Sequence, residues 1–201
     1  AEPDFISKED ESCSTNDPLY GLQWNLMNSG QYGTEYIGID INYSGVSQLI
    51  PENTDIVVAV VDEGIQLNHP DLSANMLDTG FDAETRSSPS VCYGSHGTNC
   101  AGIIGAISNN GIGISGIFNG KLMSISTKLK NDTLSTFKRA ESIVYATEHG
   151  ADVISNSWMS RIRLSAIDEA IKYALSQGRN GLGCVVVFAS GNSGYKEILY
   201  P

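Results

Sequence analysis

Apolar runs and helically spaced apolar residues alternate along this chain. A continuous apolar run at residues 56–61 has the pattern of a strand buried on both faces of a parallel sheet. Further strands are predicted at 121–127, 153–158 and 184–189, and helices at 96–108, 134–147 and 165–178. Ser165 and Asp168 have the spacing of a capping box at the start of the last helix. Strands that alternate with helices predict an α/β fold with an open parallel sheet.

Polar residues follow two of these strands and begin one helix. Asp62 directly follows the run 56–61, His96 opens a glycine-rich helix, and Asn192 lies in the glycine turn after 184–189. In an open parallel sheet, functional groups gather outside the carboxyl ends of the strands. An aspartate and a histidine form two thirds of a nucleophilic triad, and a turn amide can donate to an oxyanion. Each residue alone could equally be a turn or capping residue, but together they predict a catalytic site.

Composition narrows the classes of function. A chain of 201 residues with 41% hydrophobic residues is one globular domain by default. Its net charge of −11 argues against nucleic-acid binding, which needs a basic surface. No apolar run is long enough to span a membrane. Residues 1–16 are expected to form a polar arm, either a solvated tail or partly a cation site.

The four cysteines show no metal-type Cys-x-x-Cys spacing. Cys100 and Cys184 fall within predicted core elements and are expected to be buried thiols. A bridge between Cys13 and Cys92 is compatible with the sequence but is not established by it, so the redox compartment stays open. The histidines are scattered along the chain, which argues against a zinc site.

Three motifs resemble those of the subtilisin-like serine proteases. Val60-Val61-Asp62-Glu63-Gly64-Ile65, with Asn68-His69-Pro70-Asp71-Leu72, resembles the family's aspartate motif. Residues 96–102 (His-Gly-Thr-Asn-Cys-Ala-Gly) resemble its histidine motif, and 189–192 (Ala-Ser-Gly-Asn) its oxyanion-asparagine turn. Residues 17–24 and 176–183 are similar to the kexin/furin branch in particular. The resemblance implies an open, mostly parallel sheet with helices on both faces, and a catalytic domain over 17–201 whose C-terminal part is missing from this chain.

The resemblance also implies roles for individual residues. Asp62 would orient His96, His96 would act as general base and then general acid, and Asn192 would donate to the oxyanion. The substrate would be an extended polypeptide, and the protein would be secreted or associated with the cell envelope. The implied substrate-binding residues are an edge at Ser157, Trp158 and Met159 and a pocket floor at Ala189, Ser190 and Gly191.

The chain departs from the family pattern in its nucleophile. The family's serine lies in a Gly-Thr-Ser motif beyond the oxyanion asparagine, and no Gly-Thr-Ser occurs in these 201 residues. We therefore expect either a serine carried by a C-terminal fragment of the same protein, or a non-catalytic binding protein that kept the fold. Met159 replaces a family glycine, and Arg161 and Arg163 stand where the kexin branch has acidic residues. A preference for paired basic residues is therefore not expected.

The resemblance further implies a structural calcium site, since Ca²⁺ takes six to eight oxygen ligands. The alternative is a loop closed only by backbone hydrogen bonds. A second family calcium site lacks its acidic residues here and is not predicted. The implied ligands are the side chains of Asp17, Asp71 and Asn110 and the carbonyl oxygens of Ile107, Ile112 and Ile114.

Residues 111–116 (Gly-Ile-Gly-Ile-Ser-Gly) match the dinucleotide-binding fingerprint by letter. That fingerprint requires a preceding strand, whereas a helix and a polar loop are predicted here. A nucleotide-dependent α/β enzyme is therefore the least favoured class.

Overall fold

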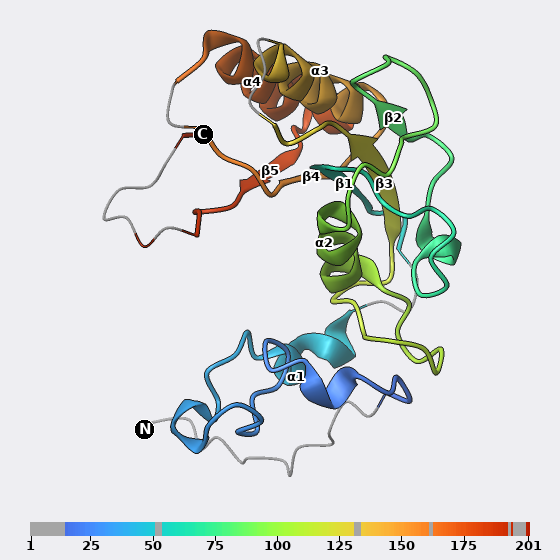
Figure 1. Cartoon of the computed structure of the whole chain (residues 1–201), viewed down its shortest axis with the longest axis vertical. Helices are drawn as coiled ribbons and strands as arrows, with labels where there is room; N and C mark the ends of the chain where they lie inside the picture. The colour runs from blue at the N-terminus through green and yellow to red at the C-terminus, as the bar shows by residue number, and fades with distance from the viewer. Residues whose placement is uncertain (1–14, 51–53, 131–133, 161–162, 193, 195–199) are drawn as a thin grey trace.

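The computed structural model describes residues 15–50, 54–130, 134–160, 163–192, 194 and 200–201 (Figure 1). Its centre is a five-stranded sheet in the order β2-β3-β1-β4-β5, in which all neighbouring strands run parallel. This confirms the predicted open parallel sheet. The strands are β1 (Val57–Asp62), β2 (Phe81–Asp82), β3 (Lys121–Ser126), β4 (Val153–Asn156) and β5 (Val185–Phe188). The helices are α1 (Tyr43–Val46), α2 (His96–Gly105), α3 (Ser135–Glu148) and α4 (Ser165–Gly181), with 3-10 turns at Tyr20–Leu22, Thr34–Tyr36, Ser47–Leu49 and Ser73–Asn75.

Helices cover both faces of the sheet: α2 lies on one face, and α3 and α4 lie on the other (Figure 1). Val58 and Val60 of β1 belong to the apolar cluster that includes Ala101 of α2. Ala59 and Val61 belong to the opposite cluster, with Ile143 and Ala146 of α3 and Ile167 and Ala170 of α4. Because successive strand residues point to opposite faces, β1 needs apolar residues at every position. This explains the continuous apolar run.

Some element boundaries differ from the predicted ones. Helix α2 ends at Gly105 rather than near residue 108, and its last backbone bond runs from Ala106 N to Gly102 O. Helix α4 loses helical geometry at Gly178, the predicted end, although a further turn continues to Gly181. Strand β2 was not predicted, because two residues are too few to show a period. It nevertheless forms the edge of the sheet beside β3.

The predicted capping box at the start of α4 is wrong. Ser165 is the first helical residue, and the cap position belongs to Leu164, which makes no side-chain capping bond. The carboxylate of Asp168 instead accepts hydrogen bonds from Arg163 Nε and the Tyr200 hydroxyl, both at 2.9 Å. Arg163, just before the helix, and the distant Tyr200 therefore bind the carboxylate that a capping box would have used.

The segment 15–50 contains no strand and packs on the loop 109–116. The side-chain amide of Gln23 exchanges two hydrogen bonds with the backbone of Ser115, at 2.7 and 2.8 Å. Leu19 N donates to Gly113 O at 2.9 Å. The predicted arm at 1–16 lies almost wholly outside the described residues. In the part of the chain that the structure describes, no helix is long and apolar enough to cross a membrane.

Candidate active site

The side chains of Asp62 and His96 meet at the carboxyl edge of the sheet. Nδ1 of His96 lies 2.8 Å from Oδ1 and 2.9 Å from Oδ2 of Asp62. The Asp62 carboxylate is fully buried, whereas the His96 side chain is 51% exposed. The pairing of these two residues, predicted from separate motifs, is therefore present in the structure.

Strand β1 and helix α2 hold this pair in place. Asp62 ends the central strand, and its carbonyl accepts from Thr127 N at 2.8 Å. Its Oδ1 also accepts from Glu63 N at 2.7 Å. Helix α2 starts at His96, and a Cβ on the next residue, Gly97, would lie 2.4 Å from Gly64 O and 3.1 Å from Asp62 Cβ. Only glycine at position 97 therefore allows the helix to begin so close to the strand end.

The geometry defines which nitrogen of His96 can act as a base. An ionised carboxylate only accepts hydrogen bonds, so Nδ1 must carry the proton that it donates to Asp62. Nε2 is then the unprotonated nitrogen. Among the described residues, no hydroxyl or thiol forms a hydrogen bond with Nε2. The contact with Asp62 thus leaves Nε2 as the nitrogen that can accept a proton.

Cys100 lies one helical turn beyond His96 but is not placed as a nucleophile. Its Sγ is 4.0 Å from Nδ1, the nitrogen already bonded to Asp62, and it donates to Ser157 Oγ at 3.4 Å. Burial raises the pKa of the Cys100 thiol, which keeps it protonated near neutral pH. The ligand atoms of Asp62, His96 and Cys100 lie within 4.8 Å of one another, so a soft metal ion could bridge them only by displacing the dyad's hydrogen bond.

The expected thiols differ in exposure. Cys184 is buried, as predicted, whereas Cys100 is only partly buried. Cys92 is exposed and carries a free thiol. Its suggested partner, Cys13, lies outside the described residues.

The predicted substrate edge follows β4 on the same side of the sheet. Trp158 is buried and packs edge-on against Phe188 of β5, with ring centroids 5.1 Å apart. The sulfur of Met159 lies 2.8 Å from the position that a Cβ on Gly191 would occupy. Met159 therefore borders the Ala189-Ser190-Gly191 turn that was predicted as the pocket floor, and it crowds that turn where a glycine would leave space.

Asn192 lies just beyond the carboxyl end of β5, and its side chain is exposed. The turn that carries it is anchored by Ala189 N, which donates to Asn156 O at 3.1 Å. Gly191 has a φ of +96°, a conformation that favours glycine. No bond joins Asn192 to the dyad within the described ranges. The structure thus places this residue on the same edge of the sheet but in no contact with His96.

The residues predicted to bind calcium are brought together by the loop after α2. Asp17 and Asp71 are both buried, and Asn110 links them: its backbone N donates to Asp17 at 3.0 Å and its Nδ2 to Asp71 at 2.9 Å. No basic side chain pairs with either carboxylate in the described part of the chain. The carbonyl oxygens of Ile107, Ile112 and Ile114 accept no hydrogen bond there either.

This cluster fits a hard cation in charge and in donor type. Two buried carboxylates without a basic partner leave uncompensated negative charge, and free carbonyl oxygens suit Ca²⁺. Asp17 is engaged by the Thr15 hydroxyl and by the backbone N–H groups of residues 109–111, so the loop is also closed by hydrogen bonds. For Asn110 to act as a ligand, its amide would have to turn its oxygen toward Asp71.

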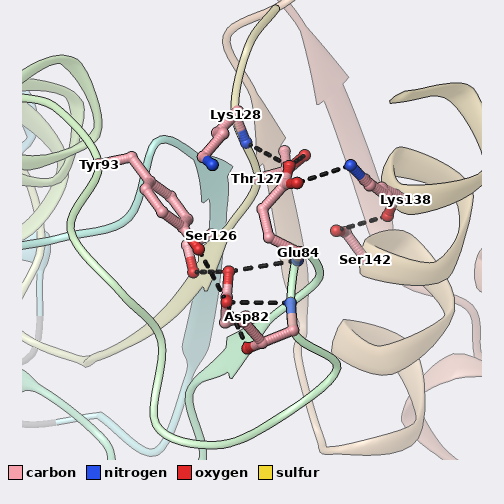
Figure 2. A network of polar contacts seen from close by, with 9 residues as sticks. Asp82, Glu84, Tyr93, Ser126, Thr127, Lys128, Lys138 and Ser142 are labelled. Carbon is pink, nitrogen blue, oxygen red and sulfur yellow. Dashed lines mark hydrogen bonds and ion pairs between the residues drawn. The ribbon is translucent and has the colours of Figure 1, made fainter. Parts of the chain in front are cut away.

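Sequence reasoning missed a network of polar contacts at the ends of β2 and β3 (Figure 2). Asp82, at the end of β2, accepts hydrogen bonds from the hydroxyls of Tyr93 at 2.9 Å and Ser126 at 3.0 Å. The only available signal was the isolated Phe81-Asp82 pair, which has no periodicity. These contacts join residues 11 and 44 positions apart, so only the fold reveals them.

A parallel α/β sheet with a hydrogen-bonded aspartate–histidine pair at its carboxyl edge is an arrangement that serine-type catalytic sites use. The Subtilase family model, peptidase S8, matches residues 53–201. The chain belongs to this family.

The chain is similar to thermitase of Thermoactinomyces vulgaris, with 34% identity over 187 residues, covering 92% of this chain and 61% of thermitase. It is 30% identical to kexin of Saccharomyces cerevisiae over 203 residues, covering 94% of this chain and 24% of kexin. A solved structure of fervidolysin from Fervidobacterium pennivorans, a keratinolytic enzyme related to subtilisin, superposes with a TM-score of 0.66 at 26% identity. That superposition covers 88% of this chain and 25% of fervidolysin. The chain thus spans less than two thirds of each of these relatives.

Proposed function

We propose that this chain is the part of a serine endopeptidase catalytic domain that carries the aspartate and the histidine. The observation that carries the proposal is the contact of His96 Nδ1 with both oxygens of the buried Asp62 carboxylate. Membership of the subtilase family supports the same reaction class. The serine would come from polypeptide beyond these 201 residues.

The proposed mechanism uses His96 Nε2 as the base. It takes the proton of the serine hydroxyl while the serine oxygen attacks the scissile carbonyl, and Asp62 stabilises the resulting imidazolium. The Asn192 amide donates to the developing oxyanion. The imidazolium then returns its proton to the leaving amine, which leaves an acyl-enzyme. A water molecule, deprotonated by the same nitrogen, hydrolyses that ester and frees the serine.

The proposed substrate is an extended polypeptide that adds as a strand beside Ser157-Trp158. The packing of Trp158 on Phe188 gives this edge a rigid support. Met159 reaches the Gly191 turn, so we expect the primary pocket to favour smaller side chains than a pocket with glycine at this position.

The outer strand of the sheet supports the presence of further polypeptide. Val185 and Val187 of β5 are 52% and 49% exposed, while Val186 and Phe188 pack inward against the core. Within the described residues, β5 pairs only with β4. Its exposed apolar face and unpaired edge suit a covering segment, which we propose to be the serine-bearing remainder of the same protein.

We also propose that Asp71, Asp17, Asn110 and the carbonyl groups of the loop 107–114 hold a structural Ca²⁺ ion. When bound, the ion would neutralise the two buried carboxylates and tie the segment 15–50 to the loop after α2. Calcium is plentiful outside the cytoplasm, which agrees with the expected secreted or cell-envelope location.

Active-site labelling tests the proposed reaction. The protein purified from its source would be treated with a fluorophosphonate probe and analysed by denaturing mass spectrometry, in parallel with His96→Ala. We expect the label on a serine in a Gly-Thr-Ser segment, and at least a 10³-fold slower hydrolysis of peptide substrates by His96→Ala. His149→Ala is the matched control, because His149 bonds Tyr145 O and stacks on the Tyr145 ring at the end of α3, on the other face of the sheet from α2.

The activity of His149→Ala should equal that of the unmodified protein. A folded protein that neither takes the label nor hydrolyses peptides would refute the proposal. That result would favour a non-catalytic binding protein with the same fold.

A further inference from the structure

The loop before His96 is tied to two strand ends through one residue, Tyr93. The Tyr93 backbone N donates to Glu63 O at 2.7 Å, and Glu63 directly follows Asp62. The Tyr93 hydroxyl donates to Asp82 Oδ2 at 2.9 Å (Figure 2). Tyr93 thus connects the residue beside Asp62, the end of β2 and the segment that leads into α2.

Asp82 is suited to be the fixed end of this connection. It is fully buried at the end of β2, opposite Ser126 of β3. Its carboxylate also accepts from Thr85 N at 3.1 Å, Thr85 Oγ1 at 2.5 Å and Ser126 Oγ at 3.0 Å. Burial raises the pKa of Asp82, but the hydrogen bonds from Thr85, Tyr93, Ser126 and Glu84 N outweigh it and hold the pKa below its usual value. Asp82 is therefore an ionised acceptor held by two strands.

The same anchor reaches the loop by a second route. Ser126 Oγ, which donates to Asp82, accepts from Val91 N at 2.9 Å. Lys128 covers the Tyr93 ring, with its ammonium 5.0 Å from the ring centroid. Burial and the Asp82 carboxylate raise the pKa of Tyr93 to about 12, so its hydroxyl stays a donor at neutral pH. The hydroxyl bond of Tyr93 thus adds to the backbone bonds of Tyr93 N and Val91 N, and the three together restrict the position of this loop.

We propose that Tyr93, held by Asp82, is a positioning residue that sets the His96 imidazole against Asp62. Only Gly94 and Ser95 separate it from His96, so a displacement of Tyr93 passes directly to the start of α2. The dyad depends on contacts of 2.8 and 2.9 Å, which a shift of a few tenths of an ångström would weaken. This inference rests on the proposed function, because positioning matters only if the imidazole serves as the base.

The test is Tyr93→Phe, which removes the hydroxyl and keeps the ring. Tyr173→Phe is the matched control, because its hydroxyl bonds Glu148 at 3.1 Å between α4 and α3, on the other face of the sheet. In the active protein, we expect Tyr93→Phe to lower kcat about tenfold with KM changed less than twofold. A purely structural loss would instead lower the fraction of active enzyme, counted with the fluorophosphonate probe, and leave kcat per labelled site unchanged.

The imidazole itself supplies a readout that does not need activity. Among the described residues, the Asp62 carboxylate and the Cys100 thiol contact the His96 imidazole. A looser contact with Asp62 changes the surroundings of the imidazole ring, so the Cε1 proton resonance of His96, followed by NMR, should shift in Tyr93→Phe. The downfield Nδ1 proton resonance should also move upfield. Tyr173→Phe should change neither signal.

Unchanged NMR signals and an unchanged kcat in folded Tyr93→Phe would overturn the positioning role. If the unmodified protein hydrolyses nothing, the proposed function fails, yet the NMR comparison still tests the positioning. Should Tyr93→Phe not fold, Asp82→Asn replaces it, because asparagine keeps an acceptor for the hydroxyl but removes the charge. A smaller upfield movement of the His96 Nδ1 proton resonance is then expected, and an unmoved resonance would refute the role.

Discussion

Gly97 offers a sharp test of how the dyad is built, because another glycine of α2 serves as its control. A Cβ at position 97 would lie 2.4 Å from Gly64 O, against about 3.4 Å for an ordinary contact, so Gly97→Ala must move the helix start by about 1 Å. The His96–Asp62 contact of 2.8 Å would then exceed hydrogen-bonding distance. A misplacement of this size costs about 10²-fold in rate.

The same substitution has an opposite effect one helical turn and a half further on. A Cβ on Gly102 would lie 3.4 Å from Ile114 Cδ1, an ordinary contact, so Gly102→Ala should gain the ~0.5–1 kcal/mol by which alanine exceeds glycine in a helix. For Gly97→Ala the clash, of roughly 1–3 kcal/mol, outweighs that gain. We expect the melting temperature to rise by about 1–4 °C in Gly102→Ala and to fall by about 2–8 °C in Gly97→Ala.

Calorimetry and steady-state kinetics of both variants would measure these effects. If the kcat of Gly97→Ala equals that of the unmodified protein, the argument from the close approach of α2 to β1 is refuted. A loss of stability in Gly102→Ala equal to that in Gly97→Ala would show that the effect is not specific to the site.

Three further predictions follow from the geometry. Asn192→Ala should lower kcat by about 10²–10³-fold with little change in KM, measured by steady-state hydrolysis; an unchanged kcat would exclude the oxyanion role. If the free Ca²⁺ concentration is about 100 times its dissociation constant, removal of the ion by a chelator should lower the melting temperature by about 5–10 °C. In Asp17→Asn, the chelator should leave the melting temperature unchanged. Because the pKa of Tyr93 is raised in the fold, its contribution to stability should be full below pH 10 and lost between pH 10 and about 12, with an upper bound of roughly 2.7 kcal/mol. Urea unfolding of the unmodified protein and of Tyr93→Phe at pH 9 and pH 12 would measure it, and a difference that persists at pH 12 would contradict it.

Much of the fold could be predicted from local pattern alone. The run at 56–61 is apolar because β1 lies between α2 on one face and α3 and α4 on the other, and both layers require buried residues. The helical spacing in 134–147 and 165–178 marked α3 and α4 for the same reason. Boundaries were less accurate: α2 ended early, and Asp168 of the predicted capping box bonded to Arg163 and Tyr200 instead.

The amino-acid sequence by itself determined the order of β1, β3, β4 and β5 and of α2, α3 and α4, the family motifs, and Asp62, His96 and Asn192 as candidate site residues. Those signals are local, because each depends on residues that are neighbours in the chain. Only the tertiary structure decided that His96 bonds both oxygens of a buried Asp62, that Cys100 lies at the wrong nitrogen for a nucleophile, and that Met159 crowds Gly191. The tie between Tyr93 and Asp82 likewise depends on the packing of β2 beside β3, since a buried hydrogen bond between separate elements leaves no period in the sequence.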